Sequence, residues 1–283
     1  MNIAYFNGNF LPKDEIKISP DDRGFLFADG IYEVMKWTSG FFYDLESHII
    51  RMKRSLKEIS INWPEEDTFS GFAHKLIELN GLSDKQALIY LQVTRGAAPR
   101  THYFPGPEVT PTVYAFVREF IPSGILPGTG IRVMVKEDIR WSRCDIKSVA
   151  LLPNTLSFQE AHQKGLGECI FFRNGLITEG SHSNIFFVVD GTLFTYPESG
   201  YILSGVTRKN ILRIARQAGI PVKEEPISVN DLATVQEAFI TNTSAEVTPV
   251  TALGSHTVGN GTAGAVTMLI HKIFHSEIAA QRG

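Results

Sequence analysis

The sequence predicts a two-domain protein of the α+β class. Short apolar stretches of strand length are separated in some places by turn residues and in others by helical spacings, so hairpins and helices both connect the expected strands. No Gly-x-Gly-x-x-Gly follows an expected strand, which argues against a doubly wound fold. Residues 120–128 hold two prolines and two glycines, so we expect a linker there, between a domain of residues 1–119 and one of residues 129–283.

The composition favours a protein that acts on small molecules. A chain of 283 residues with 43% hydrophobic residues can bury a large core. The net charge of -3 and the pI near 6.3 provide no basic surface for nucleic acid and no polybasic tract for a membrane. Because no signal-peptide pattern and no apolar run of membrane-spanning length is found, we expect a cytoplasmic protein. Cys144 and Cys169 fit two reduced thiols rather than a disulfide framework or a metal site.

Turn residues and apolar spacing place the elements of the first domain. Asn7-Gly8 supplies the positive φ angles of a two-residue hairpin turn between two short strands. Apolar residues at helical spacing predict one helix over residues 45–59, ahead of Pro64, and a second over residues 67–79, ahead of Asn80-Gly81. Strands are expected over residues 31–37, 41–43, 87–94 and 112–117.

The first long strand and the loop after residue 94 hold candidate binding residues. Alternation along the strand places Tyr32 and Val34 on one face and Glu33 on the other. The loop carries Arg100 and His102, and a guanidinium and an imidazole two residues apart can converge on one carboxylate. The alternative is an ordinary solvated loop.

The second domain is expected to contain three helices between short strands. The first helix covers residues 155–164, the second follows residues 203–208 and closes at Ala218-Gly219, and the last covers residues 261–278. The buried stripe of the last helix is expected to include Val266, Leu269 and Ile273. Strands are expected over residues 130–136, 168–172, 176–178, 185–189 and 238–241.

Two segments of this domain are rich in donors that suit a phosphate group. The start of the second helix combines small residues with Thr207, and free N–H groups and the positive end of the helix dipole point outward there. Thr207 could equally serve only as the N-cap. A second donor cluster spans residues 242–246. The acid Glu179 precedes a Gly-Ser-x-Ser segment between two strands, for which plain turn chemistry is the alternative.

One lysine stands in an unusual environment. Residues 138–149 crowd two arginines, two aspartates, a tryptophan and a cysteine around Lys147. Lysines mostly lie solvated on the surface, so this segment alone proves little. The other motifs distinguish Lys147, which we interpret as a Schiff-base lysine. Such a lysine must lose its proton, and desolvation near cations such as Arg140 and Arg143 disfavours its charged form.

Taken in order, these fragments resemble the pyridoxal-phosphate transaminases of fold type IV, and among them the D-amino-acid aminotransferases. The resemblance covers almost the whole chain. It implies a smaller N-terminal α/β domain, a larger β-rich C-terminal domain that binds the cofactor pyridoxal 5'-phosphate, and a homodimer. The matching fragments are Asp21-Asp-Arg-Gly, Asp29-Gly-Ile-Tyr32-Glu, Gln92-Val-Thr-Arg95-Gly, Glu137-Asp-Ile-Arg-Trp, Arg143-Cys-Asp-Ile-Lys147-Ser, Thr178-Glu179-Gly, Gly205-Val-Thr207-Arg208 and Glu246-Val-Thr-Pro.

The resemblance assigns a role to each cofactor residue. Lys147 forms the Schiff base and carries a proton between the substrate Cα and the cofactor. Glu179 binds the pyridine nitrogen, and a carboxylate there keeps the ring protonated so that it can accept electrons. Arg51 anchors the phosphate, with His48 nearby. Further cofactor contacts are implied for Leu203, which packs on the ring, and for Val206, Thr207, Asn242 and Thr243 at the phosphate.

The resemblance also implies where the substrate binds. Tyr32, Arg100 and His102 trap the substrate α-carboxylate, and the position of this carboxylate relative to the lysine sets the stereochemistry. His182 stands where the D-transaminase pattern has a serine, so it makes the site bulkier or adds a titrating group, unless it is only a loop histidine. Asn242 also replaces a serine. The remaining substrate-side residues are Val34, Ser183 and Ser244.

The expected function is ping-pong transamination between a D-amino acid, of the D-alanine or D-glutamate type, and a 2-oxo acid such as 2-oxoglutarate. The partners are thus small molecules, with no nucleic acid and no membrane. Two transaminases remain as alternatives, a branched-chain L-amino-acid aminotransferase and an (R)-amine transaminase. A non-catalytic protein that binds pyridoxal phosphate is the alternative from another class.

Overall fold

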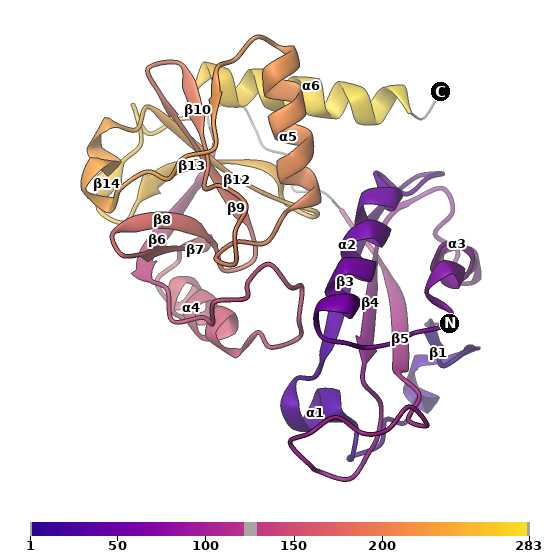
Figure 1. Ribbon diagram of the computed structural model, residues 1–283. Coiled ribbons are helices and arrows are strands. Elements are labelled where there is room, and N and C mark those ends of the chain that lie inside the picture. Colours follow the sequence, from indigo (N-terminus) through magenta and orange to yellow (C-terminus); the bar gives the residue numbers. More distant parts are fainter. Residues whose placement is uncertain (1, 122–128, 282–283) are drawn as a thin grey trace. The chain divides into compact units, whose positions relative to one another are not determined.

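The computed structural model describes residues 2–121 and 129–281, which form two compact units (Figure 1). The first unit contains the residues up to Ile121 together with Ile146–Ala150, and the second contains residues 129–145 and Leu151–Gln281. Residues 122–128 of the expected linker lie outside the described residues. The segment Ile146–Ala150, which the sequence places in the second domain, packs with the first unit.

The first unit is built on an antiparallel sheet with five strands among the described residues, in the order β2-β1-β5-β4-β3. Helices α2 (Leu45–Glu58) and α3 (Phe69–Leu79) pack on the sheet and share one apolar core with it. A short helix, α1 (Arg23–Phe27), precedes the third strand. The strands are β1 (Ile3–Phe6), β2 (Asn9–Pro12), β3 (Gly30–Thr38), β4 (Gln86–Thr94) and β5 (Thr112–Glu119).

Local sequence signals account for the first hairpin and for the two faces of β3. The hairpin turn is confirmed, since Asn7 and Gly8 have φ angles of 45° and 88° between the paired strands β1 and β2. The alternation is confirmed as well. Tyr32 and Val34 are partly exposed, whereas Glu33 on the opposite face is fully buried. Both observations follow from backbone geometry that a few neighbouring residues determine.

One expected strand of the first unit does not form. In place of a strand over residues 41–43, the chain makes an isolated bridge between Trp37 and Phe42. The reason is the early start of α2, which begins at Leu45 directly after Asp44, a residue with a φ of 50°. The chain therefore turns into the helix before a ladder can extend.

The second unit is organised by a mixed sheet, with nine strands in its described part, in the order β11-β10-β9-β12-β13-β6-β7-β8 and with β14 paired to β13. The pairs β13/β6, β6/β7 and β10/β11 are parallel, and the other pairs are antiparallel. The strands are β6 (Ile131–Glu137), β7 (Glu168–Arg173), β8 (Leu176–Gly180), β9 (Asn184–Val189), β10 (Thr192–Phe194), β11 (Val222–Lys223), β12 (Glu237–Asn242), β13 (Glu246–Leu253) and β14 (His256–Thr257).

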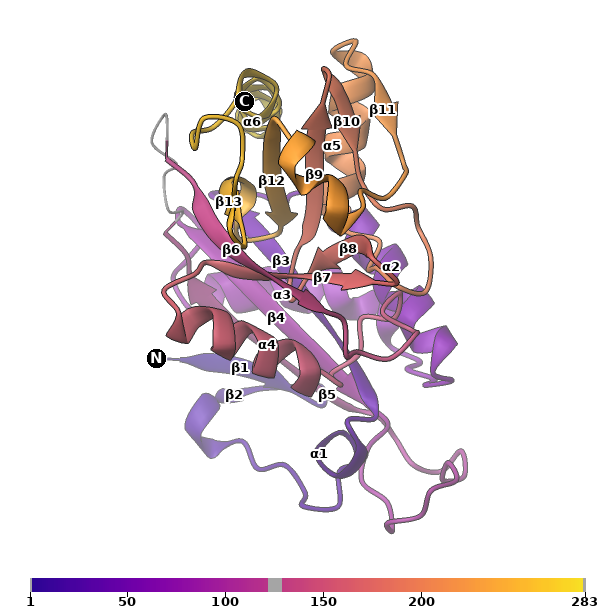
Figure 2. The same ribbon diagram turned by 90° about the vertical axis from the view of Figure 1, so that its left-hand side faces the viewer.

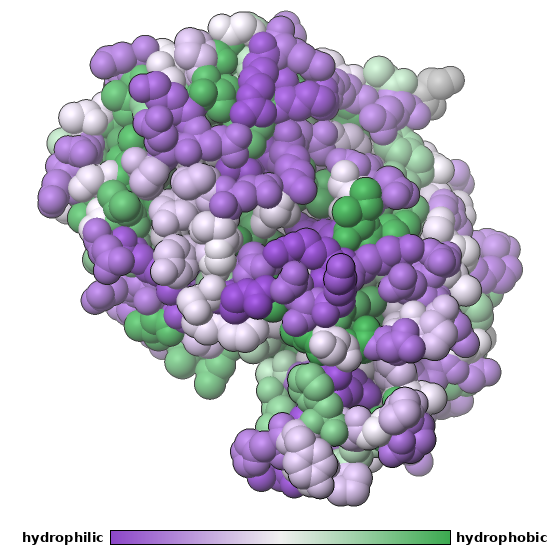
Figure 3. Space-filling view, viewed as in Figure 1, coloured by the Kyte–Doolittle hydropathy of each residue, from purple (hydrophilic) through white to green (hydrophobic). Residues whose placement is uncertain are grey.

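Three helices flank this sheet in the described residues. Helix α4 (Leu152–Gln163) packs on β7, while α5 (Val206–Gln217) and α6 (Ala265–Ala280) pack on β12 and on each other (Figure 2). Helix α5 is amphipathic, and Figure 3 shows hydrophilic side chains over its outer side, where Lys209, Arg213 and Arg216 are exposed. Strands linked by hairpins in some places and by helices in others confirm the α+β class.

The buried face of α6 differs from the expectation. Leu269 is 44% exposed, and the buried residues are Thr267, Ile270, Phe274 and Ile278. The Glu237 carboxylate accepts hydrogen bonds from the Val266 and Thr267 N–H groups, at 3.0 and 2.7 Å, and so turns Thr267 toward β12. Because α6 has apolar residues on nearly every side, spacing alone could not determine its buried face. None of the described helices is long and apolar enough to cross a membrane.

Candidate active site

Lys147 is held by the start of β3. The Tyr32 N–H donates to the Lys147 carbonyl oxygen at 3.0 Å, and the Val149 N–H donates to the Gly30 carbonyl oxygen at 3.0 Å. These bonds flank an antiparallel bridge that joins the two segments. The Lys147 N–H points at the buried Ser55 hydroxyl oxygen in α2, 3.3 Å away. The Lys147 ammonium nitrogen lies 4.2 Å from the centre of the Tyr32 ring, so lysine and tyrosine side chains share one face of the sheet.

The opposite face of β3 carries a buried acid that sequence reasoning did not assign to the site. Glu33 accepts from Arg51 Nε at 2.7 Å and from Arg51 Nη2 at 2.8 Å, and His48 Nδ1 lies 2.9 Å from Glu33 Oε2. Burial raises the pKa of Glu33, but Arg51 and His48 outweigh burial and hold this pKa far below its usual range. Burial lowers the pKa of His48, and Glu33, which acts in the opposite direction, offsets this shift only in part. The alternation along β3 was the available signal, since an acid on the core face needs a cation.

The structure brings together two of the three residues expected to trap a carboxylate. The Arg100 guanidinium carbon lies 4.9 Å from the centre of the Phe27 ring, and the His102 ring lies edge-on to the same ring at 5.7 Å. Arg23 approaches Phe27 as well, at 4.7 Å. Arg100 and His102 are both exposed. Among the described residues Tyr32 makes no hydrogen bond or ring contact with either of them; it stacks on Tyr90, which lies across from Val34 in the sheet.

The loop that carries Arg100 and His102 is anchored at its base. Asp29 accepts from Arg95 Nε and Nη2, at 2.8 and 2.9 Å, and from Arg23 Nε at 2.9 Å. The Arg95 guanidinium also lies 3.5 Å from the centre of the Phe104 ring. A carboxylate that joins two arginines thereby links the start of α1 to the loop that follows β4.

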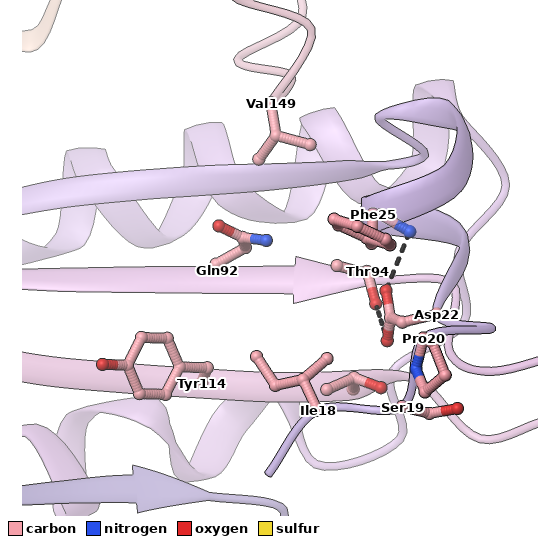
Figure 4. A pocket seen from close by; sticks show the side chains of 11 residues that line it. Ile18, Ser19, Pro20, Asp22, Phe25, Gln92, Thr94, Tyr114 and Val149 are labelled. Carbon is pink, nitrogen blue, oxygen red and sulfur yellow. Dashed lines mark hydrogen bonds between the residues drawn. The ribbon is translucent and has the colours of Figure 1, made fainter. Parts of the chain in front are cut away.

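A cavity of about 650 Å³ opens on the Tyr32 side of the first sheet (Figure 4). Gln92, which pairs with Tyr32 in the register of β3 and β4, lines this cavity together with Tyr114 and Val149. The Asp22 carboxylate at its edge accepts from the Thr94 hydroxyl at 3.0 Å and from the Gly24 N–H at 2.8 Å. The remaining lining residues are Ile18, Ser19, Pro20, Phe25 and Thr112.

In the second unit, Glu179 at the end of β8 is buried and receives three hydrogen bonds. Arg140 Nη1 donates to Oε1 at 2.7 Å, while Asn184 Nδ2 and the Leu203 N–H donate to Oε2 at 3.0 and 2.9 Å. Burial raises the pKa of Glu179 to about 7, although Arg140 opposes this shift. A carboxylate has about four acceptor positions, so one remains for a further donor. A protonated pyridine nitrogen fits that position because it supplies both a hydrogen and a positive charge.

Arg140 and Arg143, which the sequence suggested as cations near Lys147, are each paired with carboxylates. Arg140 binds Asp138 through Nε and Nη2, at 2.9 Å each, in addition to Glu179. Arg143 Nε donates to Asp145 at 3.0 Å. Both guanidinium groups are therefore neutralised by neighbouring carboxylates. Arg140 instead orients Glu179, a role that sequence reasoning missed because the two residues are 39 positions apart.

The start of α5 provides unpaired backbone donors, as expected. Gly205 is the N-cap, so the alternative reading of Thr207 as the N-cap is wrong; Val206 and Thr207 are the first two helical residues and are buried. The first N–H groups of a helix have no acceptor within the helix. A Cβ on Gly205 would lie 2.1 Å from Asn184 Oδ1, so only glycine lets this helix begin against Asn184. Leu203, partly buried, is tied by its N–H to Glu179 and by its carbonyl oxygen to Asn184.

The second donor cluster is the loop between β12 and β13. Asn242 Oδ1 accepts from the Ser244 N–H at 2.9 Å, the Ala245 N–H at 2.6 Å and the Ser244 hydroxyl at 3.1 Å. The Asn242 side chain therefore stabilises the loop conformation and accepts the hydrogen bond that the Ser244 hydroxyl donates. Thr243, at the tip, is partly exposed, and Glu246 ends the loop with a φ of 53°. A three-residue hairpin loop closed by a left-handed residue fixes where the Thr243 donors lie.

His182 and Ser183 both contact a second buried acid, Glu168. The Ser183 hydroxyl donates to Glu168 Oε2 at 2.7 Å, and His182 Nδ1 lies 3.0 Å from the same oxygen. The His182 ring packs edge-on against Phe158 at 4.8 Å. Burial raises the pKa of Glu168, but His182 and the serine hydroxyls hold it below its usual value. These residues thus fix the turn after Glu179, and no sequence motif marked Glu168 beyond its place at the start of an apolar strand.

The comparisons with known proteins agree with this fold. The family model for amino-transferase class IV matches residues 30–253. The chain therefore belongs to the class IV aminotransferases. It is 38% identical to a D-alanine aminotransferase of Staphylococcus haemolyticus over 283 residues, 99% of each chain. It is also 38% identical to a D-alanine aminotransferase of Staphylococcus aureus over 280 residues, 98% of each.

A solved structure supports the same fold. The branched-chain amino acid aminotransferase of Escherichia coli superposes with a TM-score of 0.91 at 26% identity and covers 97% of this chain and 94% of its own. This agreement confirms the fold-type IV architecture. The similarity in fold does not by itself select a substrate, because one fold supports several specificities.

Proposed function

We propose that the protein is a pyridoxal 5'-phosphate-dependent D-amino-acid aminotransferase. It transfers the amino group of a D-amino acid, of the D-alanine or D-glutamate type, to a 2-oxo acid such as 2-oxoglutarate. The observation that carries the proposal is the match to D-alanine aminotransferases at 38% identity over 99% of both chains. The Arg100 and His102 pair around Phe27 supports it, since a guanidinium and an imidazole can converge on one carboxylate.

Lys147 performs the proton transfer in this proposal. When bound, pyridoxal phosphate withdraws electrons from the substrate Cα and so makes its hydrogen acidic. The Lys147 amine holds the cofactor and then moves this proton at Cα. Its backbone bonds to Tyr32 and Gly30, through the neighbouring Val149, keep the amine on one face of β3. A fixed base combined with a fixed carboxylate site gives a single stereochemistry.

Glu179 binds the ring nitrogen and keeps it protonated. Its remaining acceptor position and its raised pKa, about 7, favour a cationic N–H donor as partner, because such a donor stabilises the ionised carboxylate. Arg140 and Asn184 hold the carboxylate in place. Leu203 packs on the ring, and its own N–H binds Glu179, so ring and carboxylate positions are linked.

The phosphate group is bound by donors at the start of α5 and in the loop before β13. We assign Val206 and Thr207 to the first group and Thr243 to the second. Asn242 shapes that loop through its side-chain oxygen. We also assign Arg51 to the phosphate, as the resemblance implies; its Nε and Nη2 donate to Glu33.

The substrate α-carboxylate is bound by Arg100 and His102 together with Tyr32. The remaining substrate-side residues, Val34, His182, Ser183 and Ser244, limit the side chains that fit. We further propose a homodimer. We also propose a cytoplasmic enzyme, since Cys144 and Cys169 are both free thiols, as a reducing compartment keeps them.

Half-reaction assays test the specificity. The holoenzyme is mixed with D-alanine, L-leucine or (R)-1-phenylethylamine, and the loss of cofactor absorbance is followed before 2-oxoglutarate is added. We expect D-alanine to react fastest. A faster reaction with L-leucine would support the branched-chain alternative instead.

Chemical trapping tests the catalytic role itself. Borohydride reduction of the holoenzyme followed by peptide mapping is expected to place the cofactor on Lys147. Lys36, a buried lysine of the same unit, serves as the internal control and should remain unmodified. If Lys147 carries no adduct, the protein belongs to the non-catalytic class.

A further inference from the structure

The turn between β8 and β9 connects two strands that no ladder pairs in the described sheet. Glu179 lies near the end of β8, which pairs with β7, whereas Asn184 begins β9, which lies between β10 and β12. Nevertheless, Asn184 Nδ2 donates to Glu179 Oε2 across this gap, at 3.0 Å. Leu203 binds both residues from one side. Besides Leu203, the turn of residues 180–183 therefore determines how these two side chains meet.

Glu168 lies level with this turn. The last pair of the ladder between β7 and β8 joins Ile170 to Gly180. Glu168, two residues earlier on β7, therefore extends past the end of β8, and its side chain is fully buried. Successive residues of a strand point to opposite faces, so Glu168 and Ile170 share one face.

The Glu168 carboxylate binds the turn through both of its oxygens. Oε1 accepts from the Ser181 N–H at 3.2 Å and from the Ser181 hydroxyl at 2.5 Å, while Oε2 accepts from the Ser183 hydroxyl at 2.7 Å. The Cys169 N–H also donates to Oε1, at 2.7 Å. A Cβ on Gly180 would lie 2.2 Å from the Ser183 hydroxyl oxygen and 2.9 Å from Glu168 Oε2, so only glycine lets the turn close on this carboxylate.

The turn is also what stabilises the charge of this buried acid. No lysine or arginine in the described part of the chain makes an ion pair with Glu168, and His182 Nδ1 lies 3.0 Å from its Oε2. A buried carboxylate is stable only with such hydrogen bonds. The dependence is mutual, because without Glu168 the Ser181 and Ser183 hydroxyls would lose the acceptor that orients them.

We propose that Glu168 is a positioning residue for the ring nitrogen of the cofactor. By binding Ser181 and Ser183, it fixes the turn and so holds the Glu179 carboxylate against the Asn184 amide. Glu179 then presents its remaining acceptor position in a single orientation. The inference rests on the proposed function, because it concerns the acid assigned to the ring nitrogen of pyridoxal 5'-phosphate. It adds a residue that acts through Glu179 rather than on the cofactor itself.

The test compares two compounds that differ only at the ring nitrogen. In 1-deazapyridoxal 5'-phosphate a C–H group replaces this nitrogen, so the compound keeps the aldehyde and the phosphate but forms no hydrogen bond with Glu179. For each full-length variant, the Kd of each compound is measured by titration of the cofactor-depleted enzyme, and the thermal midpoint is measured without cofactor. In the original protein, pyridoxal 5'-phosphate should bind about 10- to 100-fold more tightly than the deaza compound, as for a hydrogen bond between charged groups.

The ratio of the two Kd values separates positioning from general stability. Glu168→Ala should reduce this ratio by about 10-fold or more, because Glu179 is no longer held in one orientation. Glu168→Gln should keep the ratio, since its amide oxygen can accept from the Cys169 and Ser181 N–H groups while its amide N–H donates to the Ser183 hydroxyl. Ser183→Ala removes one donor and should reduce the ratio by about 3-fold or more, which provides the test if Glu168→Ala does not fold.

Glu237→Ala is the matched control. Glu237 is a partly buried acid of the same unit that accepts from the Val266 and Thr267 N–H groups, and it lies at the end of β12 away from the loop after Asn242. Its replacement should lower the thermal midpoint and leave the Kd ratio unchanged.

Two outcomes would overturn the inference. An unchanged Kd ratio in Glu168→Ala, even with a lower thermal midpoint, would show that Glu168 is merely structural. A loss in Glu168→Gln as large as in Glu168→Ala would show that its charge, and not its hydrogen-bonded position, is responsible. If the original protein binds both compounds equally, the assignment of Glu179 to the ring nitrogen fails instead, and if it binds neither, the proposed function fails, so these failures are distinguishable.

Discussion

Replacing Glu33 by glutamine should destabilise the first unit far more than the same replacement on the surface. Glu33 is fully buried and receives two bonds from Arg51, at 2.7 and 2.8 Å, with His48 at 2.9 Å. Glutamine keeps the shape but removes the negative charge and turns an amide donor toward a guanidinium. Removing one partner of a buried pair leaves an uncompensated charge, which costs about 3–5 kcal/mol.

A surface ion pair provides the control for this substitution. Glu119 accepts from the Lys85 ammonium at 2.9 Å, a similar separation, but both side chains are about half exposed, 50% and 52%. Solvent screening limits such pairs to about 1 kcal/mol or less, so Glu119→Gln should have little effect. The two variants thus differ mainly in burial.

Urea unfolding followed by tryptophan fluorescence measures the difference, since Trp37 and Trp63 lie in the core of the first unit. The midpoint should fall in Glu33→Gln with an unchanged slope. Because the pKa of Glu33 is depressed in the folded state, its stabilising contribution is complete above the unfolded pKa, about 4.3, and is lost as the pH falls below this value. The difference in urea midpoint between Glu33→Gln and the original protein should therefore shrink at low pH. A loss in Glu33→Gln no larger than in Glu119→Gln would refute the reasoning.

Three further predictions concern the proposed reaction. Lys147→Ala should lower turnover by at least about 100-fold while the fold is retained, as circular dichroism and rate assays can show. Arg100→Ala should raise KM for D-alanine about 10-fold or more with less effect on kcat, whereas Arg118→Ala, which alters another exposed arginine of the same unit, should leave both unchanged. In the cofactor-free protein, urea stability should fall as the pH rises from about 5 to 7, since burial raises the pKa of Glu179 to about 7 and the folded state keeps a proton that the unfolded state releases. Added pyridoxal 5'-phosphate should reduce that fall, and a flat profile without cofactor would contradict the assignment.

Sequence reasoning succeeded where a few adjacent residues determine the structure. The turn at Asn7 and Gly8 and the helix α2 follow from local conformational preferences. The ordered motifs also identified the family, because each motif constrains a different part of the chain. Identifying the aminotransferase class needed no three-dimensional information.

The ion-pair partners of the buried charged residues could not be predicted from the sequence. Arg140 reaches Glu179 across 39 positions, and Glu33 reaches Arg51 across 18. A charge pattern in the sequence does not say which opposite charge it will meet, since this depends on strand register and helix rotation. The prediction of the buried face of α6 was wrong for a related reason. The carboxylate of Glu237, on a strand that is distant in the sequence, determines the rotation of that helix.

The segment Ile146–Ala150 has a second consequence, which concerns association between chains. In the described part of the first sheet, β3 is an edge strand, and Lys147 and Val149 pair with its first residues. An uncovered edge offers free N–H and C=O groups to any other strand. The segment that carries Lys147 therefore covers the first residues of this edge. A fragment that ends at Ile121 would lose this cover and expose more strand edge, so the placement of Lys147 and the protection of the edge depend on the same five residues.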